Sequence, residues 1–479
     1  MVEMKRDTGS SISRTVLKAM SIFGGMQVFT ILCGIVRTKL VAIWLGTSGV
    51  GLFAIYTSAL TLVSSLTQLN LRTSAVRTIA SHEDPRTLPV TVAVVRRLGL
   101  WLGVAGVAVM LLSAPVFSLR TFGTYGVSSM FMLLAPAVFL MALTMTDQVV
   151  LQGLGRLRPL AMSNLRGVGA GLIVSVPILY FFRDTGIVWV ITAYSFTAWL
   201  GVRMARADLP LTGPRPSSGE VWALGRPVLL MGFYLTIAAV TTELCSYIFI
   251  AFLNRAGGTA EVGLFQSGYT LVNRYMGMIF SAIGVEFFPR LSSVASHPRR
   301  TATFVSHELL LLSCVLLGVV AIFIPLAPVG VRLLYSQEFL GIVPYVLLAM
   351  PGVVFQGASW CMAFVMLARG DGKLYMATEV LSAVLTVTLN LIFFHFMGIA
   401  GIGLAFTVNN AIYAAIIGAV YYRRYRLSLS RKVLAILAGV FMVLSLMSGI
   451  ALMFNPWWSA VISVPAIAVA VVSVRKIMG

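Results

Sequence analysis

Long apolar runs alternate with short polar segments from one end of the chain to the other. A helix needs about 20 predominantly apolar residues to cross the hydrocarbon core of a bilayer. The runs therefore predict fourteen transmembrane helices. The first run is too long for the apolar part of a cleavable signal peptide, so we expect it to remain in the protein. The predicted helices cover residues 16–44, 50–74, 90–116, 127–151, 160–182, 186–204, 227–253, 263–288, 307–329, 342–368, 374–396, 402–422, 433–454 and 457–474.

The composition places the chain among polytopic membrane proteins. Hydrophobic residues make up 59% of the chain, charged residues only 10%, and the mean hydropathy is +0.95. The expected fold class is therefore an all-α polytopic membrane protein. The four cysteines lie singly inside apolar runs, with no CxxC pair, so we predict neither a disulfide framework nor a metal site. No nucleotide-binding signature appears either, and we expect no cofactor.

An internal repeat divides the chain into two halves. The segment Val50-Gly51-Leu52-Phe53 recurs as Val262-Gly263-Leu264-Phe265, at an offset of 212, and residues 153–157 resemble residues 370–374, at an offset of 217. Both matches relate a predicted helix to the one six places later. Since six is even, the two six-helix repeats run in the same direction through the membrane. The predicted lobes are residues 1–206 and 227–424, joined by a cytoplasmic linker at 207–226 and followed by helices 13 and 14 at 425–479.

The distribution of positive charge along the chain predicts its orientation in the membrane. The net charge is +20, which in a soluble protein would suggest a nucleic-acid partner. Here 28 of the 35 cations fall in loops on one side of the membrane and four on the other. By the positive-inside rule the N- and C-termini are predicted to be cytoplasmic. The charge is explained by topology, and nucleic acid is excluded as a partner.

Charged residues at membrane depth are the candidates for function. Arg274 lies near the middle of the predicted eighth helix, and Arg37 and Lys39 lie in the outer part of the first. A cation at the bilayer centre costs at least ~2.5–3.5 kcal/mol, so we expect Arg274 either to face a water-filled cavity and bind an anion or to pair with an acid. The histidines form no metal-binding or catalytic motif.

Glu243 and Arg72 have competing interpretations. Glu243 on the seventh helix lies at a depth similar to that of Arg274, so a salt bridge between the two is the main rival to anion binding. Glu243 could also bind a proton or an ion. Arg72, at the inner end of the second helix, is equally well explained as a positive-inside anchor.

The residues also resemble a known family. Leu45-Gly46 leading into Val50–Phe53, together with residues 333–339 (LLYSQEF) and 373–379 (KLYMATE), is similar to Wzx-type polysaccharide flippases of the MOP superfamily. The resemblance implies a V-shaped transporter in the bacterial inner membrane. It would move an undecaprenyl-pyrophosphate-linked oligosaccharide from the cytoplasmic to the periplasmic leaflet by alternating access. The O-antigen, common-antigen and capsule repeat units all remain open as its cargo, with a polymerase or chain-length machinery as a further partner.

The related lipid II flippases, the MurJ group, place cations of helices 1, 2 and 8 around a central cavity. By that resemblance the substrate-binding candidates are Arg37, Lys39, Arg72 and Arg274, with Glu243 beside them. Arg37 and Lys39 point about 200° apart around one helix, so only one can face the cavity squarely. We favour Arg37.

Two other functions have to be weighed. A MATE-like antiporter would share the fold and exchange small organic cations for protons or sodium, but its cavity should be acidic. A membrane-embedded enzyme would need a deep acid or a large outward loop with a catalytic cluster, and the short outward loops count against it. We therefore predict a flippase and not an enzyme.

Overall fold

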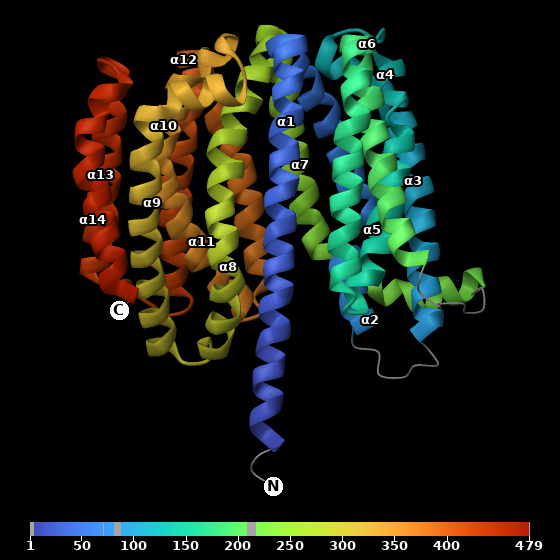
Figure 1. Cartoon of the computed structure of the whole chain (residues 1–479), viewed down its shortest axis with the longest axis horizontal. Coiled ribbons are helices and arrows are strands. Elements are labelled where there is room, and N and C mark those ends of the chain that lie inside the picture. Colours follow the sequence, from blue (N-terminus) through green and yellow to red (C-terminus); the bar gives the residue numbers. More distant parts are fainter. Residues whose placement is uncertain (1–3, 70, 81–87, 208–216, 479) are drawn as a thin grey trace. The chain divides into compact units, whose positions relative to one another are not determined.

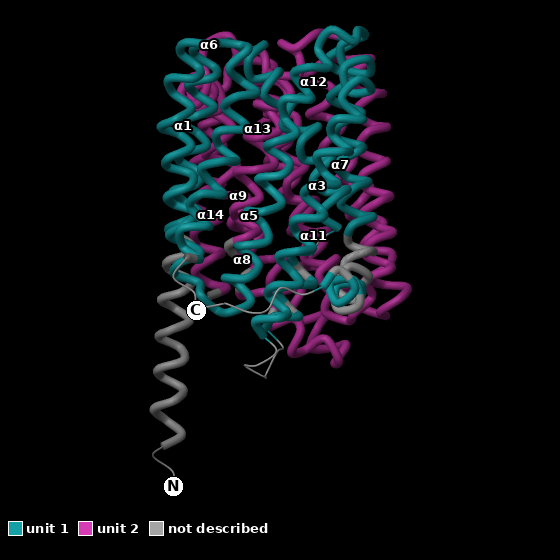
Figure 2. Tube along the Cα trace, turned by 90° about the vertical axis from the view of Figure 1, so that its right-hand side faces the viewer, with its two compact units in different colours: residues 1–256 teal, residues 257–479 magenta. Residues whose placement is uncertain are grey.

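The described chain is built of helices and turns and forms two compact units. The computed structural model describes residues 4–69, 71–80, 88–207 and 217–478, and no strand occurs among them. Unit 1 comprises Met1–Ala256 and unit 2 comprises Gly257–Gly479 (Figure 2). Within these described ranges, ten helices are long and apolar enough to span a membrane. The predicted all-α polytopic membrane fold is confirmed.

The elements follow one another as shown in Figure 1. Unit 1 contains α1 (Met4–Gln68), α2 (Leu71–Ala80), α3 (Leu88–Phe122), α4 (Ser128–Met132), α5 (Ala135–Gly153), α6 (Leu157–Ala207) and most of α7 (Ser218–Tyr269). Unit 2 continues with the π-helix η1 (Thr270–Arg274), α8 (Tyr275–Val294), α9 (Pro298–Leu334), η2 (Gln337–Ile342), α10 (Val343–Ala349), η3 (Met350–Gly352), α11 (Val353–Ala368), α12 (Gly372–Arg423), α13 (Arg431–Met453), η4 (Pro456–Ser459) and α14 (Ala460–Met478).

Four of the long helices are interrupted by one residue with a positive φ angle. The residues are Gly46 in α1, Arg183 in α6, Gly258 in α7 and Gly398 in α12. Three of the four breaks reverse the chain, because residues on either side of them touch. In α6, a Cβ on Gly167 would lie 2.9 Å from the Cα of Ala198. In α12, the Tyr413 hydroxyl donates to the Glu379 carboxylate at 2.9 Å.

In α1, the third of these hairpins, the Arg37 guanidinium lies over the Phe53 ring across the break at Gly46. These hairpins explain why α1, α6 and α12, each longer than 50 residues, each correspond to two predicted spans. The exact count of fourteen spans stays a prediction, since it also requires a reversal at Gly258.

The positions of the helix breaks follow the internal repeat. Gly46 and Gly258 are 212 residues apart, and each lies four residues before its Val-Gly-Leu-Phe segment. Arg183 and Gly398 are 215 apart, as are the helix-ending Gly155 and Gly370. Both of these glycines donate to the carbonyl three residues back, and the residue after each donates to the carbonyl five back, the arrangement of a Schellman cap. The register of the second match is therefore 215, not the 217 predicted from the side chains.

Packing inside each unit is helix on helix. In unit 1, α1 packs on α6, α3 on α5 and α5 on α6. Ile79 of α2, Val95 of α3 and Val149 of α5 meet in one buried cluster. In unit 2, α13 and α14 pack on α9, where the Ser463 hydroxyl donates to the Ala321 carbonyl at 2.8 Å. The two helices outside the repeat are thus part of unit 2.

Three predicted elements differ from the observed ones. The second predicted helix was expected to reach residue 74, but α1 ends at Gln68 and Leu69 has a φ of 47°. The span predicted at 342–368 is interrupted by η3 at Pro351, which has no backbone N–H to donate to a helix. Helix α7 begins at Ser218, within the predicted linker, and Ser217 and Glu220 form a reciprocal capping box at its start.

Candidate functional site

Arg37 is the best-organised cation of unit 1. Its guanidinium carbon lies 5.0 Å from the centre of the Phe53 ring and 4.7 Å from that of Tyr194. Phe53 comes from the second limb of α1, and Tyr194 comes from the second limb of α6. A guanidinium within about 6 Å of an aromatic face is attracted by the ring quadrupole. Two rings therefore fix the position of this cation at membrane depth.

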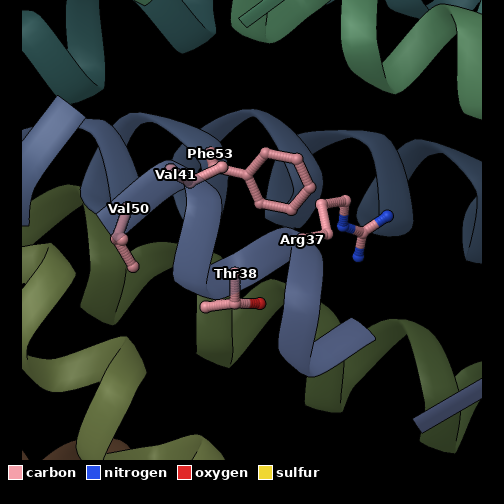
Figure 3. A pocket seen from close by; sticks show the side chains of 5 residues that line it. All are labelled: Arg37, Thr38, Val41, Val50 and Phe53. Atoms are coloured by element: carbon pink, nitrogen blue, oxygen red, sulfur yellow. The ribbon is translucent and has the colours of Figure 1, made fainter. Parts of the chain in front are cut away.

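A small pocket lies beside Arg37. Its walls are Arg37, Thr38, Val41, Val50 and Phe53, all from the two limbs of α1 (Figure 3). The cavity volume is about 20 Å³, far below the ~300–1,000 Å³ typical of a complete ligand site. It has room for about one water molecule and not for an oligosaccharide.

Lys39 and Arg72 are placed differently from Arg37. Lys39 is half-buried on α1, two residues beyond Arg37. Arg72 is exposed at the start of α2, where its neighbour Leu71 is fully buried in the cluster that joins α2, α3 and α5. Leu71 thus anchors the helix while Arg72 points away from the core. Their roles in substrate binding stay predictions.

Arg274 is the last residue of the π-helix η1. π-Helical turns are rare and are frequently found at functional sites, where the extra residue redirects the side chains that follow. The buried Leu271 and Val272 hold this turn in unit 2, and the Arg274 side chain is exposed. The ion pairs described in unit 2 are Arg290–Glu286 and Arg424–Asp371, so Arg274 is in neither.

The surroundings of Arg274 are polar. Gln356 of α11 donates to the neighbouring Asn273 at 3.5 Å, and its side-chain carbonyl is buried without a partner among the described residues. The Tyr335 hydroxyl donates to the Ser267 carbonyl at 3.4 Å. An exposed guanidinium facing lipid at this depth would cost several kcal/mol. Arg274 therefore requires water or an anion in front of it.

Glu243 is half-buried on α7 in unit 1. It lies fifteen residues before Gly258, and Arg274 lies sixteen residues after it. At 1.5 Å per residue the two are equally far from Gly258 along their helices. Since they belong to different units, their pairing stays a prediction.

Several residues beside the predicted cations could not be singled out beforehand. Phe53 was visible only as part of the repeated Val-Gly-Leu-Phe segment, and Tyr194 carries no sequence signal at all. The π-helix leaves no recognisable pattern in the sequence either. Only the distances between helices reveal the ring contacts to Arg37.

The chain is similar to known proteins in sequence and in fold. Residues 40–344 match the family of polysaccharide biosynthesis proteins. No curated protein sequence matches. Among solved structures, the chain is similar to an inward-facing multidrug resistance MATE transporter of the MOP superfamily, with a TM-score of 0.68, 15% identity, and coverage of 84% of this chain and 94% of that one.

Two further structures share the fold. One is the lipid II flippase MurJ in an inward closed conformation, with a TM-score of 0.67, 13% identity, and coverage of 95% of this chain and 99% of that one. The other is a MATE transporter of Vibrio cholerae, with a TM-score of 0.59, 16% identity, and coverage of 87% and 98%. The fold is thus that of MOP-superfamily transporters, as the sequence motifs predicted. Since the family match spans more than half of the sequence, the chain belongs to the polysaccharide biosynthesis protein family.

Proposed function

We propose that the protein is a flippase for an undecaprenyl-pyrophosphate-linked oligosaccharide. It moves this lipid from the cytoplasmic to the periplasmic leaflet of a bacterial inner membrane by alternating access of two lobes, residues 1–206 and 227–424. Both termini face the cytoplasm. The family match and the likeness to a lipid II flippase support this choice.

The observation that carries the proposal is the exposed Arg274 on its π-helical turn. A pyrophosphate presents several oxygens that a planar guanidinium can bind in pairs. A fixed cation in a hydrated cavity replaces the water that the headgroup loses, and so lowers the large cost of carrying its charge through lipid. Arg37, held between two rings, provides a second such cation.

The remaining predicted residues have supporting roles in this proposal. Lys39 and Arg72 raise the positive potential along the path of the pyrophosphate. Glu243 either balances Arg274 between transport events or binds a coupling ion. The membrane potential favours export as well, because moving one net negative charge outward from a negative cytoplasm gains ~2.3 kcal/mol per 100 mV. The protein is not an enzyme, and a polymerase or chain-length machinery acts on the delivered glycan.

The second candidate is a MATE-like antiporter of small organic cations. The similarity to a MATE transporter, with a TM-score of 0.68, shows a fold that is compatible with this function. Its substrate is a cation, however, and the cations Arg37 and Arg274 at membrane depth would repel it. The sign of the transported charge therefore separates the two functions.

The test is outward transfer of a fluorescent undecaprenyl-pyrophosphate oligosaccharide in proteoliposomes with an imposed potential. The unmodified protein is compared with Arg274→Ala and with a matched control, Arg332→Ala. Arg332 is also exposed in unit 2 but lies near the end of α9. Ethidium efflux is measured in parallel in the same vesicles.

We expect transfer by the unmodified protein and by the Arg332 variant, and none by the Arg274 variant. If the Arg274 variant transferred lipid as fast as the Arg332 variant, Arg274 would not be part of the binding site. Efflux of ethidium without lipid transfer by the unmodified protein would replace the flippase with the antiporter.

A further inference from the structure

The two ion pairs described in unit 1 share one carboxylate, that of Asp147. Asp147 lies near the end of α5, and its side chain is only 7% exposed. Arg206, from the last turn of α6, lies 2.5 Å from it, and Arg96 of α3 lies 3.8 Å from it. One buried acid therefore binds two guanidinium groups from two other helices.

The close approach of α3 and α5 explains this arrangement. A side chain on Gly99 would collide with Thr146, so the absence of one lets the two helices touch. Arg96 lies three residues before Gly99, and Asp147 directly follows Thr146. Residues three apart on a helix lie on the same face, which brings Arg96 beside the carboxylate.

A third arginine brings more positive charge than Asp147 can balance. Arg203 lies one turn before Arg206 and stacks on Trp199, with 5.6 Å between the guanidinium carbon and the ring centre. Its positive charge is close enough to Arg96 to repel the Arg96 guanidinium. The Arg206 side chain is 14% exposed, whereas that of Arg96 is 42% exposed and Arg203 is exposed as well. Two of the three guanidinium groups are thus accessible beyond the buried pair.

The surrounding sequence does not cancel this excess. Between residues 72 and 226, the segments on the same side of the predicted membrane carry twelve arginines against five acids. The arginines are Arg72, Arg77, Arg86, Arg96, Arg97, Arg156, Arg158, Arg166, Arg203, Arg206, Arg215 and Arg226, and the acids are Glu83, Asp84, Asp147, Asp208 and Glu220. Even if every acid pairs with an arginine, positive charge remains for an anion.

The neighbouring side chains identify the depth of the cluster. Phe196 is exposed on α6 one turn from Trp199, and Trp222 is exposed on α7 beside Val221, which is buried in the same cluster of α2, α3 and α5. Exposed tryptophan side chains such as that of Trp222 are typical of the membrane interface, where lipid headgroups lie. An anion that reaches Arg96 and Arg203 there is most simply the phosphate of a lipid.

We propose that Arg96 and Arg203 bind the phosphate of an anionic lipid headgroup at this end of unit 1. Asp147 positions Arg96 and neutralises Arg206, so that the two accessible guanidinium groups face the ligand. Each can donate two parallel hydrogen bonds to phosphate oxygens. This site uses neither Arg37 nor Arg274 and does not depend on the proposed transport.

The test is titration of the purified full-length protein in detergent with short-chain phosphatidylglycerol, with bound lipid counted by native mass spectrometry. The variants are Arg96→Gln and Arg203→Gln. The matched control is Arg158→Gln, because Arg158 is exposed in the same unit and on the same predicted side but makes no described contact with Asp147. Phosphatidylcholine and inorganic phosphate are titrated as the other arms.

We expect each of the two variants to bind phosphatidylglycerol about tenfold more weakly than the unmodified protein and the Arg158 variant. If all three variants bind alike, the site is wrong. Tight binding of inorganic phosphate that depends on Arg96 and Arg203 would replace the lipid with a free anion. The Arg203 variant keeps both ion pairs of Asp147, so it tests the site even if Arg96→Gln does not fold.

Discussion

The hydroxyl groups of Thr121 and Tyr247 lie 2.6 Å apart, and both residues are buried. Thr121 ends α3 and Tyr247 lies on α7, where Asn254 also donates to the Thr121 carbonyl at 2.9 Å. The Tyr247 ring packs against Phe117 with 4.9 Å between centres. These contacts hold the first limb of α7 in unit 1, although the repeat assigns it to the second lobe. The lobe boundary at residue 227 stays a prediction.

Tyr247→Phe should destabilise the protein, because it leaves the buried Thr121 hydroxyl without its partner. An unpaired buried hydroxyl costs about 1–3 kcal/mol, whereas removing both partners is nearly neutral. We therefore expect the double variant Thr121→Val with Tyr247→Phe to be more stable than Tyr247→Phe alone. Thermal unfolding in detergent measures both. Tyr180→Phe, whose side chain is 64% exposed, is the control and should not change stability.

Removing either ring beside Arg37 should weaken substrate binding. Phe53→Leu and Tyr194→Leu keep an apolar side chain but lose the ring face, so we expect affinity for undecaprenyl pyrophosphate to fall about fivefold for each. Tyr194→Phe keeps the ring and should change it by about twofold at most. Binding is measured on the purified protein. Equal losses in the Leu and Phe variants of Tyr194 would assign the effect to its hydroxyl instead.

Arg183→Gly should stabilise the protein. Arg183 forms the break of the α6 hairpin with a φ of 46°, whereas the breaks in α1, α7 and α12 are at glycine residues. A side chain in this region of backbone space costs about 1 kcal/mol, and glycine avoids that cost. Arg183→Lys keeps the side chain and should show no gain in thermal unfolding. A gain for Lys equal to that for Gly would point to the charge and not the backbone.

Tyr425 should make the stability of unit 2 sensitive to alkaline pH. Its hydroxyl donates to Asp371 at 2.6 Å, and burial together with this carboxylate raises its pKa. A raised pKa in the folded state gives stability that is present below the ordinary pKa of about 10 and is lost as the pH rises above it. Tyr425→Phe should flatten that alkaline loss. Unfolding is followed from pH 7 to 11, and an unchanged slope in the variant would contradict the prediction.

The fold could be predicted because its signals are local. Apolar runs long enough for a bilayer determine the spans, whereas the side of the membrane on which each arginine-rich loop lies stays a prediction. The predicted helix bounds were wrong where a single residue changes the backbone conformation, as Leu69 does, or where Pro351 removes a helix hydrogen bond. The Schellman caps at Gly155 and Gly370 gave the repeat its true register, which side-chain likeness had shifted by two residues.

The candidate site could be predicted only in part. The cost of a cation in lipid identified Arg37 and Arg274, since that cost depends on position along an apolar run alone. Tyr194, which stacks on Arg37, lies 157 residues further along the chain and has no pattern of its own. The same holds for Gln356 beside Asn273. Contacts between distant helices depend on packing, which a single sequence does not display.

The π-helix that ends at Arg274 also bears on the lengths of the two halves. Equivalent points are 212 residues apart at Gly46 and Gly258, but 215 apart at Gly155 and Gly370, so this stretch of the second half is three residues longer than its counterpart. A π-helical turn adds one residue to an otherwise regular helix. The turn at Thr270–Arg274 therefore accounts for one of the three residues. Around Leu62, which lies 212 residues before Arg274, the first half is an unbroken α-helix, so its backbone lacks the turn that redirects the Arg274 side chain.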